Sequence, residues 1–118
     1  MSKEVSRIIG MSYLKSNLTI EEVGNILSEK LFAGFPFGGK EENIYEEIPA
    51  IFIRVPILGL RIVLQGKSGI DENSGFALEI LPWISFDKQV DKDILLDDYL
   101  TQILKLLLKD RDDIIVIE

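Results

Sequence analysis

The pattern of apolar and polar residues divides the chain into strand-like and helix-like segments. Residues 5–14 mix β-branched and aromatic residues with polar ones and predict a strand. Three further strands are predicted at residues 50–55, 60–65 and 76–81, the first two joined by a four-residue loop, and a short terminal strand at residues 114–117. Within 60–65 and 76–81, alternation leaves one face apolar and the other mixed, which is typical of an antiparallel sheet covered on one side.

Helical periodicity first appears after residue 18. Thr19 and Glu22 have the spacing of a capping box, in which each side chain bonds to the backbone of the other residue, so we expect a helix to start there. Its apolar positions recur on one face, and Gly34 is placed to end it after residues 32 and 33. Gly24 lies inside this helix, where glycine costs about 1 kcal/mol relative to alanine, and therefore indicates close approach to a neighbouring element.

A second helix is predicted to open at residues 91–93 and to end near Lys109. Acidic residues at its start and lysines near its end complement the helix dipole. Its apolar stripe is formed by Leu96, Tyr99, Leu100, Ile103, Leu104 and Leu107. Leu95, Leu106 and Leu108 widen this stripe, so the helix is either deeply buried or contacts another subunit, as in a homodimer through residues 93–109.

These elements predict the order β-α-β-β-β-α-β without a repeat or linker. We therefore expect residues 1–118 to form one α+β domain, with two helices packed on one face of a mostly antiparallel sheet.

Composition excludes most common catalytic machinery. The 118 residues contain no His and no Cys, so neither a Ser-His-Asp triad nor a cysteine nucleophile can form, and metal sites built from imidazole or thiolate are excluded. Residues 66–68 resemble the end of a phosphate-binding loop, but position 61 is Arg rather than Gly. Residues 71–75 superficially match a calcium loop, but Phe76 and Pro82 stand where it needs Gly and Glu. We expect no enzyme activity, cofactor or metal.

Carboxylates remain the acid–base groups present in quantity. General acid–base catalysis would need two of them with separated pKa values. The candidates are Glu41, Glu42, Glu46, Glu47, Asp97 and Asp98. Nothing in the sequence distinguishes any of them from ordinary surface acids.

The formal net charge of −7 is unevenly distributed. Residues 1–40 carry +1 and residues 41–118 carry −8. Like charges repel over a Debye length of about 8 Å at physiological salt, so this balance disfavours nucleic acids and anionic membranes and favours a basic partner. Residues 1–10 contain no signal-peptide core, and Pro and Arg interrupt apolar residues 48–65, which rules out a span of ~20 apolar residues. We expect a cytoplasmic protein.

The segment from Glu41 to Glu47 is the leading candidate for contact with a partner. Its four carboxylates, Glu41, Glu42, Glu46 and Glu47, flank Ile44 and Tyr45. Such acids would steer a basic partner, and Tyr45 would supply a buried anchor. Asp71 and Glu72 are second candidates. The competing interpretation is that these charges only solvate a loop.

Aromatic residues near turns have two interpretations. Phe35 and Phe37 flank Pro36 in a glycine-containing turn, and Trp83 follows Pro82 at a predicted strand end. The phenylalanines could anchor a ligand, but large apolar side chains are seldom left exposed, so we expect both rings to pack under the sheet edge.

The chain resembles the small acidic immunity proteins that bacteria make against polymorphic or contact-delivered toxins. The resemblance rests on residues 19–31, the GFPFGG sequence at 34–39, the NIYEEIPA sequence at 43–50, and the apolar strands up to Gln65. It implies a tight, non-covalent complex with one toxin, often a basic nuclease, whose active site or substrate surface is blocked. The alternative is a small acidic dimeric secretion chaperone that holds an unfolded effector segment.

Overall fold

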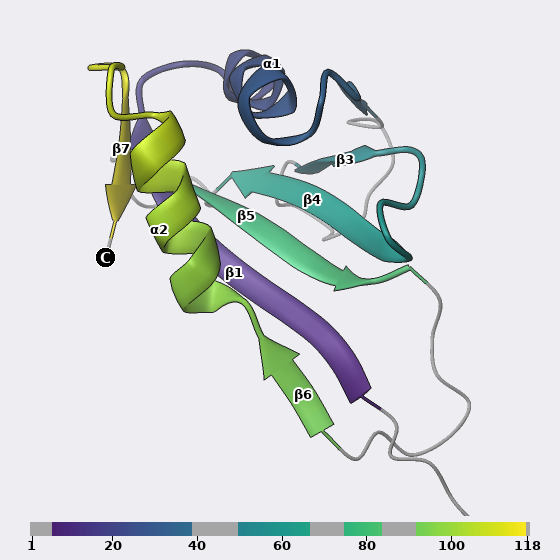
Figure 1. Ribbon diagram of the computed structural model, residues 1–118. Helices are drawn as coiled ribbons and strands as arrows, with labels where there is room; N and C mark the ends of the chain where they lie inside the picture. Colours follow the sequence, from purple (N-terminus) through teal and green to yellow (C-terminus); the bar gives the residue numbers. More distant parts are fainter. Residues whose placement is uncertain (1–5, 39–49, 67–74, 84–91, 118) are drawn as a thin grey trace, which may run out of the picture.

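The computed structural model describes residues 6–38, 50–66, 75–83 and 92–117 (Figure 1). The elements are β1 (Ser6–Ser16), α1 (Ile20–Leu31), β2 (Phe37–Gly38), β3 (Ala50–Ile53), β4 (Leu60–Gly66), β5 (Gly75–Pro82), β6 (Lys92–Leu95), α2 (Asp97–Leu107) and β7 (Ile114–Ile117). They form one mostly antiparallel sheet of seven strands with two helices, which confirms the α+β prediction.

Strand β1 organises the sheet because it pairs along both edges. The strand order is β2-β3-β4-β5-β1-β6, and β7 also pairs with β1. On one edge β1 lies antiparallel to β5; on the other, its first half pairs with β6 and its second half with β7. Only the β1–β6 pairing is parallel among these strand pairs. Figure 1 shows β6 and β7 at opposite ends of β1, with α2 leading from one to the other.

Both helices contribute to a single core on one face of the sheet. Helix α1 contacts β2, β3 and β4, and α2 contacts β1 and β7. The residues of this core with at most 2% exposure are Leu14, Val23, Leu27, Ile53, Ile62, Leu64, Leu78 and Leu104. A smaller cluster formed by Ala50, Phe52 and Val63, with Leu81 and Trp83 packed against it, is separate from this core. We call the side of the sheet that carries this smaller cluster the open face.

The predicted capping box of α1 is present. The Glu22 amide donates to the Thr19 hydroxyl over 3.2 Å, and the Thr19 amide donates to the Glu22 carboxylate over 3.0 Å. The helix ends at Leu31, and the chain then passes through two residues with positive φ, Ala33 at 53° and Gly34 at 85°. The Gly34 amide bonds back to the Ser28 carbonyl over 2.8 Å, which satisfies a carbonyl in the last turn.

Gly24 has the close neighbour that its position in the helix predicts. A Cβ added there would lie 2.8 Å from Cδ1 of Ile51 on β3. We expect Gly24→Ala to change stability little, because about 1 kcal/mol of helix propensity is offset by pushing Ile51 off its rotamer. In an Ile51→Val background, which lacks Cδ1, the same change should stabilise by about 1 kcal/mol. Urea unfolding of the four proteins measures the difference; equal effects of Gly24→Ala in both backgrounds would contradict the contact.

The prediction for the start of the second helix is wrong. Residues 92–95 form a strand, β6, parallel to β1, and α2 begins at Asp97. Asp93 is therefore not a helix-dipole residue; its carboxylate accepts two hydrogen bonds from the Arg7 guanidinium, at 3.0 and 3.2 Å. Asp97 and Asp98 occupy the acidic first turn instead, and the Asp97 carboxylate accepts from the Met11 amide at 3.3 Å.

The order of the elements and the loop between β3 and β4 also differ from the prediction. The sheet contains β2 and β6, which were not predicted, so the order is β-α-β-β-β-β-β-α-β. The loop between β3 and β4 tightens because Ile57 bridges to Leu60, which leaves Leu58 and Gly59 at the turn. Their φ angles of 52° and 74° are both positive, as a type I′ turn requires.

Candidate functional site

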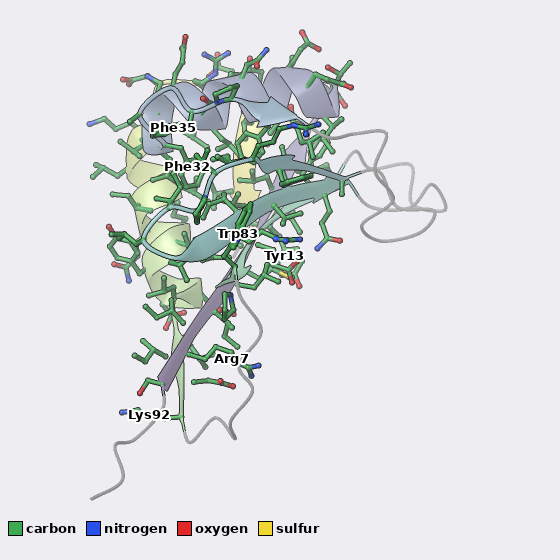
Figure 2. All side chains as sticks on the ribbon, turned by 90° about the vertical axis from the view of Figure 1, so that its right-hand side faces the viewer. Arg7, Tyr13, Phe32, Phe35, Trp83 and Lys92 are labelled. Carbon is green, nitrogen blue, oxygen red and sulfur yellow. The ribbon has the colours of Figure 1, made fainter. Side chains whose placement is uncertain are left out.

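Five strands begin or finish at the same end of the sheet, which we call the Ser16 end. At this end β1 and β4 finish, and β3, β5 and β7 begin. The register establishes it: Ala50 pairs with Gln65, Gly66 with Phe76, Gly75 with Lys15, and Ser16 with Ile114. The opposite end, where β1 and β6 begin, carries Arg7 and Lys92 (Figure 2).

The sequence-predicted contact residues lie outside the described residues. Glu41, Glu42, Tyr45, Glu46 and Glu47 belong to the segment before β3, and Asp71 and Glu72 to the segment between β4 and β5. Their attachment points are described. The first segment re-enters the sheet at Ala50, and the second leaves at Gly66 and returns at Gly75, all at the Ser16 end. The described strand ends to which both candidate segments are joined therefore lie at the same end of the sheet.

A third acidic segment, between α2 and β7, reaches the same end. Residues 110–113 read Asp-Arg-Asp-Asp. The buried hydroxyl of Ser16 anchors this segment by donating to the Asp113 carbonyl over 2.6 Å, and it accepts from the Leu18 amide at 3.1 Å. The Arg111 amide adds a bond to the Leu108 carbonyl at 3.0 Å. Ser16 thus joins the start of β7 to the turn between β1 and α1.

Arg111 and Asp113 form a two-point ion pair within this segment. Nε and Nη2 of Arg111 donate to the two carboxylate oxygens of Asp113 at 2.9 and 2.7 Å. Asp113 raises the pKa of Arg111, with a further contribution from Glu29 of α1, and the hydrogen bonds from Arg111 lower the pKa of Asp113. Both groups stay charged at neutral pH and offset each other. Asp110 and Asp112 then leave the segment net negative.

A half-open pocket of about 220 Å³ lies at the Ser16 end. Its lining comes from the turn after β1 and from the start of β7: Lys15, Ser16, Asn17, Leu18, Asp112, Asp113 and Ile115. Such a concavity, lined by the apolar Leu18 and Ile115 together with polar and charged residues, can receive a side chain of another protein. Of its charged lining residues, Asp112 is negative, Lys15 is positive, and Asp113 is paired with Arg111.

The open face carries a cluster of arginines and aromatic rings that the sequence did not predict. The Arg61 guanidinium lies 4.9 Å from the centre of the Trp83 ring and 5.8 Å from that of Phe52, and Arg54 lies 5.7 Å from Phe52. The Nε of Arg61 is buried and has no hydrogen-bond partner among the described residues. Alternation along β4 had already assigned Arg61 to the mixed face, but its stacking depends on β3 and on the end of β5. Figure 2 shows Trp83 and Tyr13 on the side of the sheet away from α2.

The two phenylalanines of the GFPFGG turn differ in their burial. Phe37 packs against the main core, and its ring meets Phe32 edge-on, with centroids 5.9 Å apart. Phe35 is 46% exposed, so the prediction that both rings are covered is wrong for Phe35. The positive φ of Gly34 redirects the chain, and Phe35 then borders a pocket of about 230 Å³ that also includes Arg54 and Val55. Figure 2 shows Phe32 and Phe35 beside α1.

Among residues 6–38, 50–66, 75–83 and 92–117, no group of three or more acidic side chains is placed to hold a metal ion. In the same part of the chain, no helix combines the length and the apolarity needed to cross a membrane.

Comparison of the chain with protein-family models, curated proteins and solved structures finds no match.

Proposed function

We propose that this chain is an immunity protein that binds a cognate bacterial toxin with a basic surface and neutralises it in the cytoplasm of the producing cell. The observation that carries the proposal is that strand ends joined to acidic segments of the sequence lie together at the Ser16 end. The segments of Glu41–Glu47 and of Asp71 and Glu72 attach there, and residues 110–113 reach the same place.

Charge and shape support a mechanism by occlusion. Acidic residues attached at one end of the sheet would steer a basic protein and raise its association rate. Asp112, which takes no part in the Arg111–Asp113 ion pair, would attract a lysine or arginine of the toxin to this pocket. Blocking a toxin's active site or substrate surface requires only a stable complex, so the chain needs no catalytic group of its own.

The first experiment identifies the partner and tests its biology. The tagged full-length chain is used to capture proteins from its native host, and each captured basic protein is then expressed alone and together with this chain. We expect one protein that stops growth alone and is tolerated when co-expressed. Absence of any such protein, with the chain folded and abundant, would count against an immunity function.

Reversing two charges tests the proposed surface. With the captured toxin, Glu46→Lys combined with Glu47→Lys should lower the association rate about tenfold at low salt and flatten its salt dependence, since electrostatic steering mainly sets that rate. Stopped-flow mixing at several ionic strengths measures both quantities. Association kinetics unchanged at every salt concentration would remove this segment from the interface.

A charge-matched pair of variants provides the control. Glu46→Gln with Glu47→Gln changes the net charge by the same amount as Ser6→Lys with Leu58→Lys. Ser6 begins β1 at the end opposite Ser16, and Leu58 is 94% exposed in the β3–β4 turn. If only total charge mattered, both pairs would lower the association rate equally. We expect the glutamine pair to lower it more.

A second candidate function is a dimeric secretion chaperone for an effector protein. The observation that favours it is the exposure of large apolar side chains on β6 and α2, with Leu95 66%, Tyr99 60% and Leu106 56% exposed. Such a chaperone holds an unfolded segment, whereas an immunity protein binds a folded toxin. Limited proteolysis of the captured complex separates the two, because a chaperone-bound segment is cleaved readily after release and a folded toxin domain is not.

A further inference from the structure

The outer side of α2 carries an apolar stripe that the core does not use. Tyr99 and Leu106 are 60% and 56% exposed, and the half-buried Ile103 lies between them. Spacings of four and three residues place the three side chains on one side of the helix. Leu100 and Leu104 are buried at 3% and 1% and face the core, so the exposed stripe is a separate surface.

The flank of this stripe has opposite charges at its two ends. Asp98, Gln102 and Lys105 follow the same spacing of four and three residues, next to Tyr99, Ile103 and Leu106. Asp98 lies in the first turn of α2 and Lys105 in the last, and Lys109 follows the C-cap residue Leu108. When two helices pack antiparallel, each flank faces the same flank of the other helix. This flank therefore complements itself only in the antiparallel orientation.

One symmetry axis satisfies both the apolar and the charged residues. A two-fold axis between Gln102 and Ile103 places Tyr99 opposite Leu106 of the partner subunit. The same axis places Asp98 opposite position 107 of that subunit, between its two lysines. At a rise of about 1.5 Å per residue Lys105 is only about 3 Å away along the helix, within reach of its flexible side chain, and Lys109 follows just after the helix end.

We propose that the chain forms a homodimer by antiparallel packing of α2 against α2 of a second copy. Two-fold symmetry makes such an interface self-complementary, as is usual for homodimers. The pairing does not depend on the proposed toxin binding, because the residues that it uses belong to α2 and to Lys109. The sequence predicted a dimer interface within residues 93–109. The proposed interface uses only α2 and Lys109.

Molar mass measured by light scattering over a range of concentrations tests the dimer with the full-length chain. We expect the mass of two chains for the native protein and of one chain for Leu106→Glu. Leu58→Glu, at a residue 94% exposed in the β3–β4 turn, is the matched control and should stay dimeric. Circular dichroism verifies that each variant folds. A native protein that is monomeric at all concentrations, or a Leu106→Glu protein that stays dimeric, would overturn the proposal.

A charge exchange tests the orientation. Asp98→Lys alone should weaken the dimer about tenfold, because it occurs twice per dimer and replaces attraction to both lysines by repulsion. Lys105→Asp alone should weaken it less, because Lys109 still attracts Asp98 of the partner subunit. Combining the two changes in one chain restores opposite charges between positions 98 and 105 across the axis, while Lys109 stays a lysine, so the dissociation constant should move back toward the native value and fall below that of either single variant. If the combined variant is weaker than either single variant, the antiparallel register is wrong.

Discussion

Replacing Leu78 with alanine is expected to lower the free energy of unfolding by about 2–5 kcal/mol. Leu78 has no exposed surface and belongs to the main core on the helix-covered face. It lies on β5 directly between Leu64 of β4 and Ser12 of β1. Its truncation removes buried apolar surface and leaves a cavity that strands paired on both sides cannot easily close.

The expected loss is large compared with the total stability of a small domain, about 5–15 kcal/mol. Urea unfolding followed by circular dichroism measures it. Leu58→Ala is the matched control, because the same side chain is 94% exposed there and its removal should change stability by less than about 0.5 kcal/mol. A loss at Leu78 below about 1 kcal/mol would contradict its placement in a close-packed core.

Replacing Ser16 with alanine is expected to cost about 1–3 kcal/mol of unfolding free energy. The change removes only one oxygen, but that oxygen donates to the Asp113 carbonyl and accepts from the Leu18 amide. Ser16 is 5% exposed, so water cannot readily replace both bonds. The variant should also loosen the link between β1 and the start of β7, where the candidate pocket lies.

Two measurements separate this local effect from a general loss of stability. Urea unfolding gives the free energy, and hydrogen exchange of the Leu18 amide should accelerate more than that of amides in the centre of β5. Ser6→Ala, at the exposed beginning of the same strand, should change neither quantity. Unchanged protection of Leu18 in Ser16→Ala would show that the hydroxyl does not anchor this turn.

The proposed binding of a basic toxin depends on where the acidic segments join the sheet. Glu41–Glu47 and Asp71 with Glu72 were selected from composition alone, and they stay predictions because they lie outside the described residues. Strand register adds that the chain joins both segments to the Ser16 end. The Asp112 and Asp113 contribution was not predicted, although the Asp-Arg-Asp-Asp sequence before a terminal strand was a visible signal.

Local signals were sufficient for much of the fold. Thr19 and Glu22 interact within one helical turn, so their spacing alone predicted the start of α1. Alternation in residues 60–65 and 76–81 predicted which side of the sheet is covered, because side chains on a strand alternate between its faces. Gly24 predicted a close neighbour, but only the fold showed that this neighbour is Ile51.

Partners distant in sequence decided the rest. Residues 91–93 have the acidic composition of a helix start, yet residues 92–95 form a strand that pairs with the first half of β1. Arg7 and Asp93, which form an ion pair across these two strands, are 86 residues apart in the sequence. The stacking of Arg61 on Phe52 and Trp83 likewise needs three strands brought together. Periodicity, capping and charge were readable from the chain because they act between near neighbours. Strand pairing, the common end at which the acidic segments join the sheet, and the unused stripe of α2 depend on long-range contacts, which only the tertiary structure specifies.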